Sequence, residues 1–373
     1  MTRGALLRRP ASASLVSLAS AVSAALLLLA TTAGLFASAL LPAGAAAAST
    51  PKTPTPAAGS LTASLPAVPS ERVKMLLSGV GGNPLFAPTG NTVVIYGRIT
   101  PYVPGQRTTV AIYLGSRKVG AKVLKVVPRT GGSGSFQIHF STRDAGSMTA
   151  KVAVHVAAGV VATGQTPAVQ FVHTEVSPGA SGASVRVLQS ELHRLHYAVP
   201  LNGVFEEGTE RALIAFRKVT NMERVGRAGR AVFHKLAHGE GNFPVRYLRH
   251  GRHVEANLTK QVLAEIEPGG NVRDIYTMSS GKPSTPTVVG NFSVYMKTFG
   301  VNEKGMVDSN YFIRGYAIHG YAEVPTYAAS HGCLRVPIPD APSIYSWVQL
   351  GTPVDVYNQG GGGSTKTRGN AGP

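Results

Sequence analysis

The chain of 373 residues contains a single cysteine, Cys333, and this one count restricts what it can fold into. One thiol excludes an internal disulfide framework, a zinc site made of four cysteines and an iron–sulfur cluster. Hydrophobic residues make up 43% of the sequence and charged residues only 14%, which is enough apolar surface to form buried cores. The chain must therefore be stabilised by packed cores rather than by cross-links, and its length predicts two or three domains.

The first 48 residues have the pattern of a targeting segment. Three Arg residues form a basic head before position 10, and no further charge occurs until Lys52. An apolar stretch from Ala21 to Leu41 follows and ends in small residues, as in secreted proteins that are cleaved after export. The stretch is also long enough to span a bilayer. Residues 1–48 are therefore predicted to be a signal peptide or a retained membrane anchor, with the rest of the chain exported to the cell wall or the outer face of the membrane.

The charge of the chain is strongly basic. Lys and Arg number 36 against 18 Asp and Glu, a formal net charge of +18. In a cytosolic protein this excess would suggest nucleic acid. In an exported protein it favours anionic cell-wall polymers or lipid headgroups, and we expect no nucleic-acid partner.

Composition and periodicity divide the remainder of the chain. Residues 49–70 are rich in Pro, Thr and Ala and are predicted to form an extended linker. Residues 71–174 alternate apolar and polar side chains with a period of two, in runs such as 92–96, 109–113 and 151–156 that Gly, Pro and Asn interrupt. This pattern predicts an immunoglobulin-like β-sandwich without the inter-sheet disulfide.

The period changes to that of a helix over residues 175–240. Val185, Leu188, Leu192 and Leu195 form one apolar stripe, and two more helices are predicted from Thr209 and over 228–236. The segment resembles the peptidoglycan-binding domain family, although an Asn occurs where that family usually has an Asp. A helical spacer without a ligand is the alternative.

Strands return over residues 243–358, ahead of a Gly-rich tail, 359–373, that is predicted to be disordered. Residues 256–263 and 272–278 are predicted to pair as a hairpin, and 312–318 to form a later strand. Asp340 is predicted to cap the helix that follows. The whole chain is thus predicted to be multidomain and mainly β, with a small helical module.

The chemistry of the chain is predicted to lie around its one thiol. Cys333 occurs in the run Ser330-His331-Gly332-Cys333-Leu334-Arg335, and His319 ends a predicted strand nearby. A histidine that reaches a cysteine favours nucleophilic catalysis, since the imidazole can take the thiol proton. A zinc site made of His319, His331 and Cys333 is an alternative, and so is a buried, inert cysteine.

The same residues resemble the L,D-transpeptidase catalytic domain family. His319-Gly320 and the Ser-His-Gly-Cys core carry the resemblance, together with Ser279-Ser280-Gly281-Lys282 and Thr285-Pro286-Thr287 upstream. The resemblance implies a β-rich catalytic domain in which Cys333 is the nucleophile and His319 its base and later its acid. It also implies that His331 and the N–H groups of Gly332 and Cys333 face the oxyanion. Further implied positions, for binding substrate or bracing the loop, are Arg335, Ser330, Tyr321 and Tyr327.

The resemblance implies a cell-wall enzyme that needs no metal or organic cofactor. Its expected partners are peptidoglycan stem peptides and glycan strands, and β-lactams of the carbapenem type as covalent inhibitors. The expected reaction releases D-alanine and joins diamino acid residues of two stems. An L,D-carboxypeptidase that uses water, a catalytically inactive wall-binding protein and an exported zinc hydrolase are the alternatives.

Overall fold

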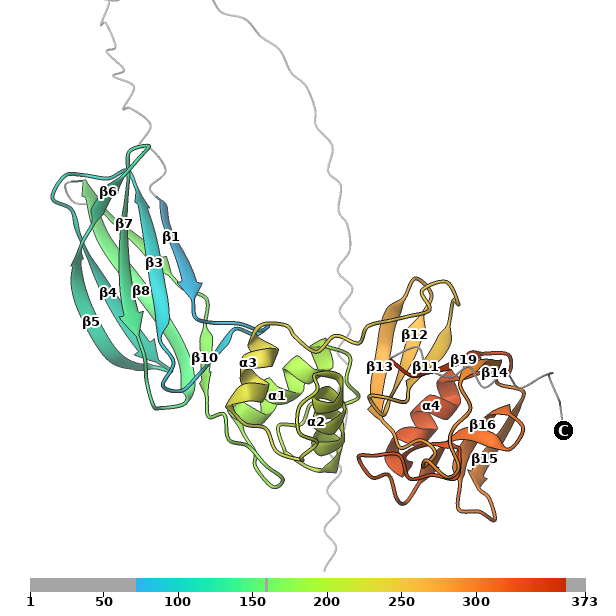
Figure 1. The fold of residues 1–373 in the computed structure, drawn as a ribbon. Helices are drawn as coiled ribbons and strands as arrows, with labels where there is room; N and C mark the ends of the chain where they lie inside the picture. The colour runs from blue at the N-terminus through green and yellow to red at the C-terminus, as the bar shows by residue number, and fades with distance from the viewer. Residues whose placement is uncertain (1–71, 158–159, 360–373) are drawn as a thin grey trace, which may run out of the picture. The chain divides into compact units, whose positions relative to one another are not determined.

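A computed structural model describes residues 72–157 and 160–359, and these ranges are mainly β (Figure 1). The predicted signal or anchor segment, the linker up to residue 70 and the tail from residue 360 lie outside them. No helix among the described residues has both the length and the apolar character needed to cross a bilayer.

Residues 72–172 form two β-sheets. The first sheet has the order β1 (Arg72–Ser78), β3 (Val93–Thr100), β7 (Ser133–Phe140), β6 (Val127–Arg129). The second has the order β2 (Phe86–Pro88), β10 (Val169–Val172), β8 (Gly146–Ala157), β4 (Arg107–Leu114), β5 (Arg117–Lys125), and β9 (Val160–Gln165) pairs with β8. Ile95 on β3 and Val152 on β8 belong to one core shared by both sheets. The immunoglobulin-like relationship itself stays a prediction.

Three helices follow: α1 (Ala183–Arg194), α2 (Glu207–Val219) and α3 (Arg230–Ala237). Their apolar stripes converge, with Leu188, Leu213 and Phe233 fully buried in one cluster. The same cluster includes Val262 and Ile275 of the C-terminal region. Helix α2 therefore packs on strands of that region as well as on its neighbouring helices.

The C-terminal region contains two more sheets. One has the order β13 (Asn271–Thr277), β12 (Val262–Glu267), β11 (His253–Asn257), β19 (Pro353–Tyr357), β14 (Gly290–Ser293). The other has the order β15 (Met296–Val301), β16 (Val307–Ile313), β17 (Tyr316–Tyr321), β18 (Leu334–Pro337). A 3₁₀ turn, η1 (Ile338–Asp340), leads into α4 (Ala341–Trp347), and Trp347 is buried with Val254 and Ile318 in a core between the sheets.

Two predicted strands of this region are wrong in their extent. The segment 256–263 is the end of β11, a turn and the start of β12, and the chain reverses at Gln261 with a φ of 60°. The segment 312–318 is likewise split between β16 and β17, with Arg314 at a φ of 47°. Both reversals use a non-Gly residue in the left-handed region, where no glycine signals the positive φ.

Asp340 does not cap helix α4, as the sequence predicted. Its side chain makes no capping hydrogen bond. Its carboxylate instead accepts hydrogen bonds from Arg211 of α2, with an Nη2 to Oδ1 distance of 3.1 Å. The acid therefore ties the helical segment to the turn that follows β18.

Lys218 of α2 makes a second, fully buried connection to the C-terminal region. Its ammonium donates to the carbonyl oxygens of Gln261 and Met278, each at 2.9 Å, and to Thr277 Oγ1 at 2.7 Å. Burial lowers the pKa of this amine well below its usual value. Met278 directly precedes Ser279, whose backbone N–H and C=O both pair with Arg335, so this connection supports the strand beside the candidate site.

Candidate active site

Strand pairing brings the cysteine and the histidine of the sequence pattern together. Cys333 directly precedes β18, which runs parallel to β17. The register pairs Ile318 with Leu334 and His319 with Arg335. Two segments separated by a loop of about a dozen residues thus become neighbouring strands, as parallel pairing through a crossover allows.

Cys333 and His319 line the same cavity, whose volume is about 550 Å³. The cavity wall comprises Asn302, Glu303, Lys304, Met306, Tyr311, Gly315, His319, Tyr321, Ser330, His331, Cys333 and Arg335. Of the side chains predicted for the site, only that of Tyr327 is outside this wall, and it is 63% exposed. The backbone oxygen of Tyr327 accepts a hydrogen bond from Ser279, so this residue belongs to the surrounding scaffold.

His319 is held in one orientation. Its ring is only 2% exposed, and its Nδ1 atom lies 2.9 Å from the carbonyl oxygen of Gly320. A carbonyl can only accept, so in the neutral ring the proton is on Nδ1 and the lone pair is on Nε2. Burial, with a smaller contribution from the cation of Arg335, lowers the pKa of His319 to about 4. At neutral pH the imidazole is therefore an unprotonated base.

The Cys333 thiol is half-buried, and its Sγ lies 3.6 Å from the carbonyl oxygen of Gly315. Burial raises the pKa of this thiol, while a backbone hydrogen bond from Ala317 and the cations of Arg335 and Lys304 act in the opposite direction. The net direction is upward. The resting pair at neutral pH is consequently a thiol and a neutral imidazole, not a thiolate and an imidazolium.

The loop in front of Cys333 is fixed by hydroxyl groups. Ser330 is fully buried, and its Oγ donates to the carbonyl oxygen of Cys333 at 2.6 Å and accepts from the N–H of Gly332 at 3.0 Å. Thr287 Oγ1 donates to the carbonyl oxygen of Gly332 at 2.7 Å. Gly332 has a φ of 123°, and a Cβ there would lie 2.2 Å from the ring of Tyr316. Glycine is therefore required at this position.

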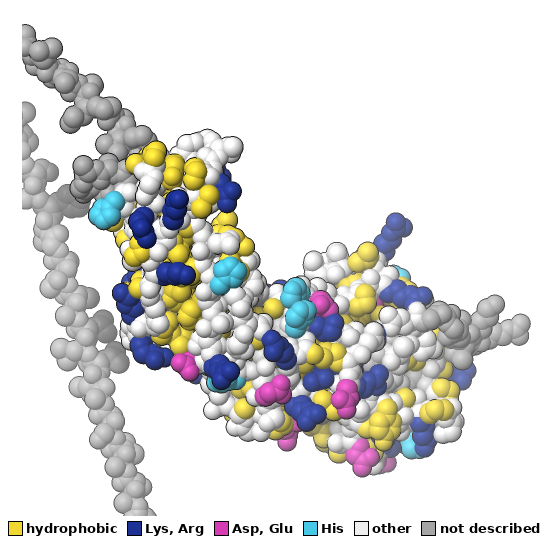
Figure 2. All heavy atoms as spheres, turned by 60° about the vertical axis from the view of Figure 1, so that its left-hand side comes forward, with side chains coloured by type: hydrophobic (Ala, Val, Ile, Leu, Met, Phe, Trp, Pro, Cys, Tyr) yellow, Lys and Arg dark blue, Asp and Glu magenta, His cyan; other side chains and the backbone are white. Residues whose placement is uncertain are grey.

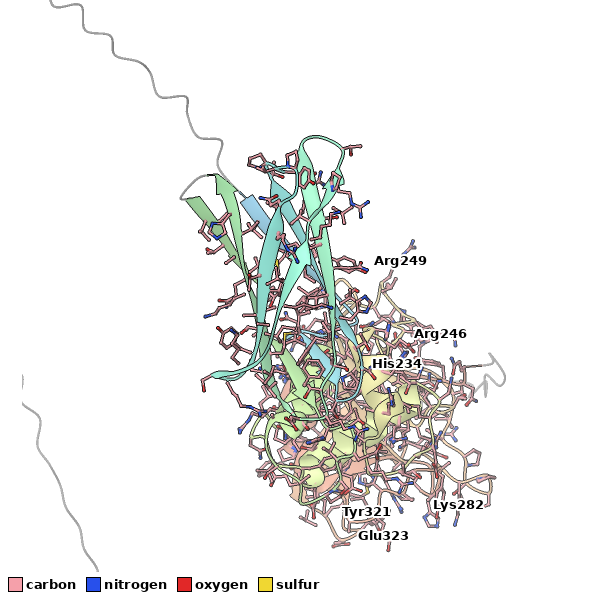
Figure 3. The ribbon with its side chains drawn as sticks, turned by 90° about the vertical axis from the view of Figure 1, so that its left-hand side faces the viewer. His234, Arg246, Arg249, Lys282, Tyr321 and Glu323 are labelled. Carbon is pink, nitrogen blue, oxygen red and sulfur yellow. The ribbon has the colours of Figure 1, made fainter. Side chains whose placement is uncertain are left out.

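This geometry corrects one expectation about the oxyanion. The N–H of Gly332 is already bonded within the loop by Ser330, so it does not face the cavity in this structure. His331 does line the cavity, and its Nε2 lies 3.4 Å from the ammonium of Lys282. Figure 3 labels Lys282 and Tyr321, which lie at the same lower edge of that view.

Arg335 is positioned by an aromatic ring. Its guanidinium carbon lies 4.0 Å from the centroid of the Tyr321 ring, and the same ring meets His319 edge-on at 5.7 Å. Stacking of this kind holds the planar cation against the cavity wall. Arg335 and His319 thus both contact the Tyr321 ring on the wall of the cavity that Cys333 also lines.

One wall of the cavity was not predicted from the sequence. The turn between β15 and β16 contributes Asn302, Lys304 and Met306. Asn302 Oδ1 accepts from the N–H groups of Lys304 and Met306, each at 3.0 Å, which makes the turn a self-bonded unit. The signal in the sequence was Asn302 followed by Gly305, a turn pattern that carries no chemistry by itself.

The zinc alternative has no geometric support. Across 72–157 and 160–359 there is no group of three or more His, Cys, Asp or Glu side chains that could hold a metal ion. His319, His331 and Cys333 share a cavity without converging as ligands.

The C-terminal region is similar to a known catalytic domain. Residues 251–356 match the model of the L,D-transpeptidase catalytic domain. Among solved structures, an L,D-transpeptidase from Xylanimonas cellulosilytica is 32% identical, with 50% of this chain and 98% of that chain covered and a TM-score of 0.47.

Two further solved structures are more distant. An L,D-transpeptidase from Stackebrandtia nassauensis is 21% identical, with 49% of this chain and 95% of that chain covered and a TM-score of 0.32. One from Mycobacterium tuberculosis is 22% identical, with 29% of this chain and 57% of that chain covered and a TM-score of 0.27. No curated protein matches the chain.

Proposed function

Because this chain belongs to the L,D-transpeptidase family, we propose that it transfers acyl groups between peptidoglycan stem peptides with Cys333 as the nucleophile. The observation that carries the proposal is the shared cavity of Cys333 and His319, with His319 Nδ1 held by Gly320. That hydrogen bond leaves Nε2 as the basic atom, which is what activation of a neutral thiol requires.

The first step forms a thioester. The sulfur of Cys333 attacks the carbonyl carbon of the L,D peptide bond in a tetrapeptide stem, while its proton passes to Nε2 of His319. The C–N bond then breaks, and the imidazolium returns that proton to the leaving amine of D-alanine. Charge forms only as bonds change, which is consistent with the raised pKa of the thiol and the lowered pKa of the imidazole.

The second step transfers the acyl group. A side-chain amine of a second stem attacks the thioester, loses a proton to His319, and releases the Cys333 thiol as the new amide forms. Water in place of the amine would give the carboxypeptidase reaction. Both outcomes use the same thioester, so they are distinguished by their products.

Cations on the cavity wall are proposed to bind the anionic parts of the substrate. Arg335, Lys304 and Lys282 are at or beside the cavity, and Arg335 is pre-positioned by Tyr321. The free carboxylate of a terminal D-alanine is the group that such cations recognise. The backbone N–H of Cys333, together with His331, is the proposed contact for the oxyanion.

We also propose where the protein acts, what its helical segment does and which inhibitors react with it. The N-terminal segment, with its basic head and apolar stretch, supports export of the protein. It would then act outside the cytoplasmic membrane, where stem peptides are assembled into the wall. The helical segment, which packs on the catalytic region through Lys218 and Arg211, is proposed to hold the enzyme on peptidoglycan. A β-lactam of the carbapenem type is proposed to acylate Cys333.

Product analysis with intact stems tests the function. The full chain incubated with purified disaccharide-tetrapeptides should release D-alanine and yield cross-linked dimers, detected by mass spectrometry. The variant Cys333→Ala should give neither product, and a chelator should leave the wild-type rate unchanged. Release of D-alanine without dimers would identify the carboxypeptidase, and loss of turnover with the chelator would contradict cysteine chemistry.

A further inference from the structure

The outer face of the sheet β1-β3-β7-β6 contains a hollow of about 740 Å³ that the transpeptidase chemistry does not use. We call it the basic groove. It is lined by Lys74, Leu76, Tyr96, Gly97, Arg98, Val127, Arg129, Thr130, Ser135, Phe136 and Gln137.

Strand register determines which side chains form the basic groove. Lys74 of β1 is opposite Arg98 of β3, and Arg98 is opposite Ser135 of β7. Two residues further along β1, Leu76 is opposite Tyr96 of β3. Because side chains alternate between the two faces of a strand, the sheet that buries its inner residues in the core must present these outward. Strand pairing thus fixes the backbone positions of these lining residues.

The two guanidinium groups are held in place. Arg98 donates from Nε and Nη2 to Ser133 Oγ, at 3.1 and 3.0 Å, and Arg129 donates from Nε to Ser135 Oγ at 2.8 Å. These bonds use neutral hydroxyls and leave further N–H donors on each group. Among the described residues, neither arginine nor Lys74 forms an ion pair. The cations are pre-positioned and their charge is not compensated.

The surrounding sheets add to this potential. Residues 72–174 contain eleven Lys and Arg against one acid, Asp144, and that acid is paired with Arg117 at 3.1 Å. On the face of these sheets that Figure 2 presents, Lys and Arg side chains lie beside hydrophobic ones with few acidic side chains. A surface of one sign, with uncompensated cations, attracts a polyanion.

We infer that the basic groove binds a linear polyol-phosphate polymer of the cell wall, with phosphodiester groups on Arg98, Arg129 and Lys74. A guanidinium group that is held in one orientation presents paired N–H donors whose geometry matches the oxygens of a phosphate group. The exposed ring of Tyr96 and the side chain of Leu76 lie along the same face, where they can contact the carbon units between phosphates. Single-stranded nucleic acid is disfavoured, because proteins that bind it stack successive bases on a series of aromatic side chains. In the lining of the basic groove Tyr96 is the one exposed aromatic ring.

Binding of the full chain to purified poly(glycerol phosphate) tests the inference independently of catalytic activity. The double variant Arg98→Gln/Arg129→Gln should bind at least ~10-fold more weakly at ~0.15 M salt, and the slope of log K against log salt should fall by about one per lost phosphate contact. The matched control, Lys118→Gln/Lys122→Gln on β5 of the other sheet, removes the same charge from exposed positions and should bind nearly as well as wild type.

Three results would overturn the inference. Equal losses in the two double variants would assign binding to overall charge. Equal affinity for poly-glutamate would exclude phosphate recognition, and tighter binding to single-stranded DNA of the same phosphate number would exclude the polyol backbone. Thermal unfolding of both variants at the wild-type temperature establishes that the sheets are intact. Sacculi whose phosphodiester polymer has been removed with hydrofluoric acid should retain less wild-type protein than intact sacculi.

Discussion

The Nδ1 atom of His319 lies 2.9 Å from the carbonyl oxygen of Gly320, the next residue of the same strand. This hydrogen bond needs no side-chain partner, since the strand backbone supplies the acceptor. It directs the lone pair of Nε2 away from the backbone and so prepares the ring to act as a base.

The pH profile should have an unusually acidic lower limb. The pKa of His319 is lowered to about 4, so the base is neutral above that value and protonated below it. We expect kcat/KM to fall about tenfold per pH unit only below pH 4. The variant His331→Gln should leave the position of this limb unchanged, because His331 is a different ring on the same cavity wall. A limb near pH 6.5 would contradict burial of the base.

Alkylation of Cys333 should show a protonated thiol at rest. Its pKa is raised by burial, so the thiolate fraction at pH 7 is small and grows about tenfold per pH unit. The rate of reaction with iodoacetamide, measured from pH 5 to 9, should rise without a plateau in the neutral range. A plateau from pH 5 to 8 would indicate a thiolate–imidazolium pair and would refute the neutral pair.

Removal of the Tyr321 ring should weaken substrate binding through Arg335. The variant Tyr321→Ala leaves the guanidinium unstacked, and the energy of such contacts predicts a roughly 2- to 30-fold rise in KM for the donor stem. The variant Tyr321→Phe retains the ring and should behave like wild type. An unchanged KM in Tyr321→Ala would show that stacking on Tyr321 does not position Arg335 for the substrate.

Loss of the Ser330 hydroxyl should loosen the loop in front of Cys333. The variant Ser330→Ala removes a buried hydrogen bond from Gly332 and a partly buried one to Cys333, and should lower the free energy of unfolding by about 1–3 kcal/mol. Ser346→Ala is the matched control, because its hydroxyl is exposed and bonds only within α4. Chemical denaturation measures both. Equal stabilities would show that the loop is fixed by other contacts.

Lys218 should be more important for stability than a lysine on the surface of the same segment. The variant Lys218→Met leaves three acceptors in the C-terminal region without their donor, and we expect a loss of about 2–4 kcal/mol. In Lys235→Met the lost ion pair with Glu240 is exposed to solvent, so this variant should unfold much like the wild type. Similar melting temperatures for the two variants would show that Lys218 does not support the strand beside Ser279.

The sequence predicted the regular parts of the fold well. Strand runs such as 109–113 and 151–156 lie within β4 and β8, because period-two alternation reflects burial on one face. Reversals at Gln261 and Arg314 were missed, since the residue with the positive φ is not a glycine at either position. Asp340 has the residue type of a helix cap, but a distant arginine uses its carboxylate instead.

The candidate site was predictable only in part. The run from Ser330 to Arg335 identified the thiol and its loop, and the cavity includes both predicted histidines. The turn at Asn302 was not predictable, because its place in the cavity depends on how β15 and β16 pair with the rest of the sheet. The use of the Gly332 N–H by Ser330 likewise depends on the three-dimensional path of the loop.

Trapping of the acyl-enzyme tests the central claim most directly. The full chain is mixed with a tetrapeptide stem, quenched in acid within the first turnover, and analysed by intact mass and peptide mapping. We expect one adduct on Cys333, equal in mass to the stem less D-alanine, and none in His319→Ala at neutral pH. An adduct on another residue, or full acylation of Cys333 in His319→Ala, would contradict the assignment of nucleophile and base.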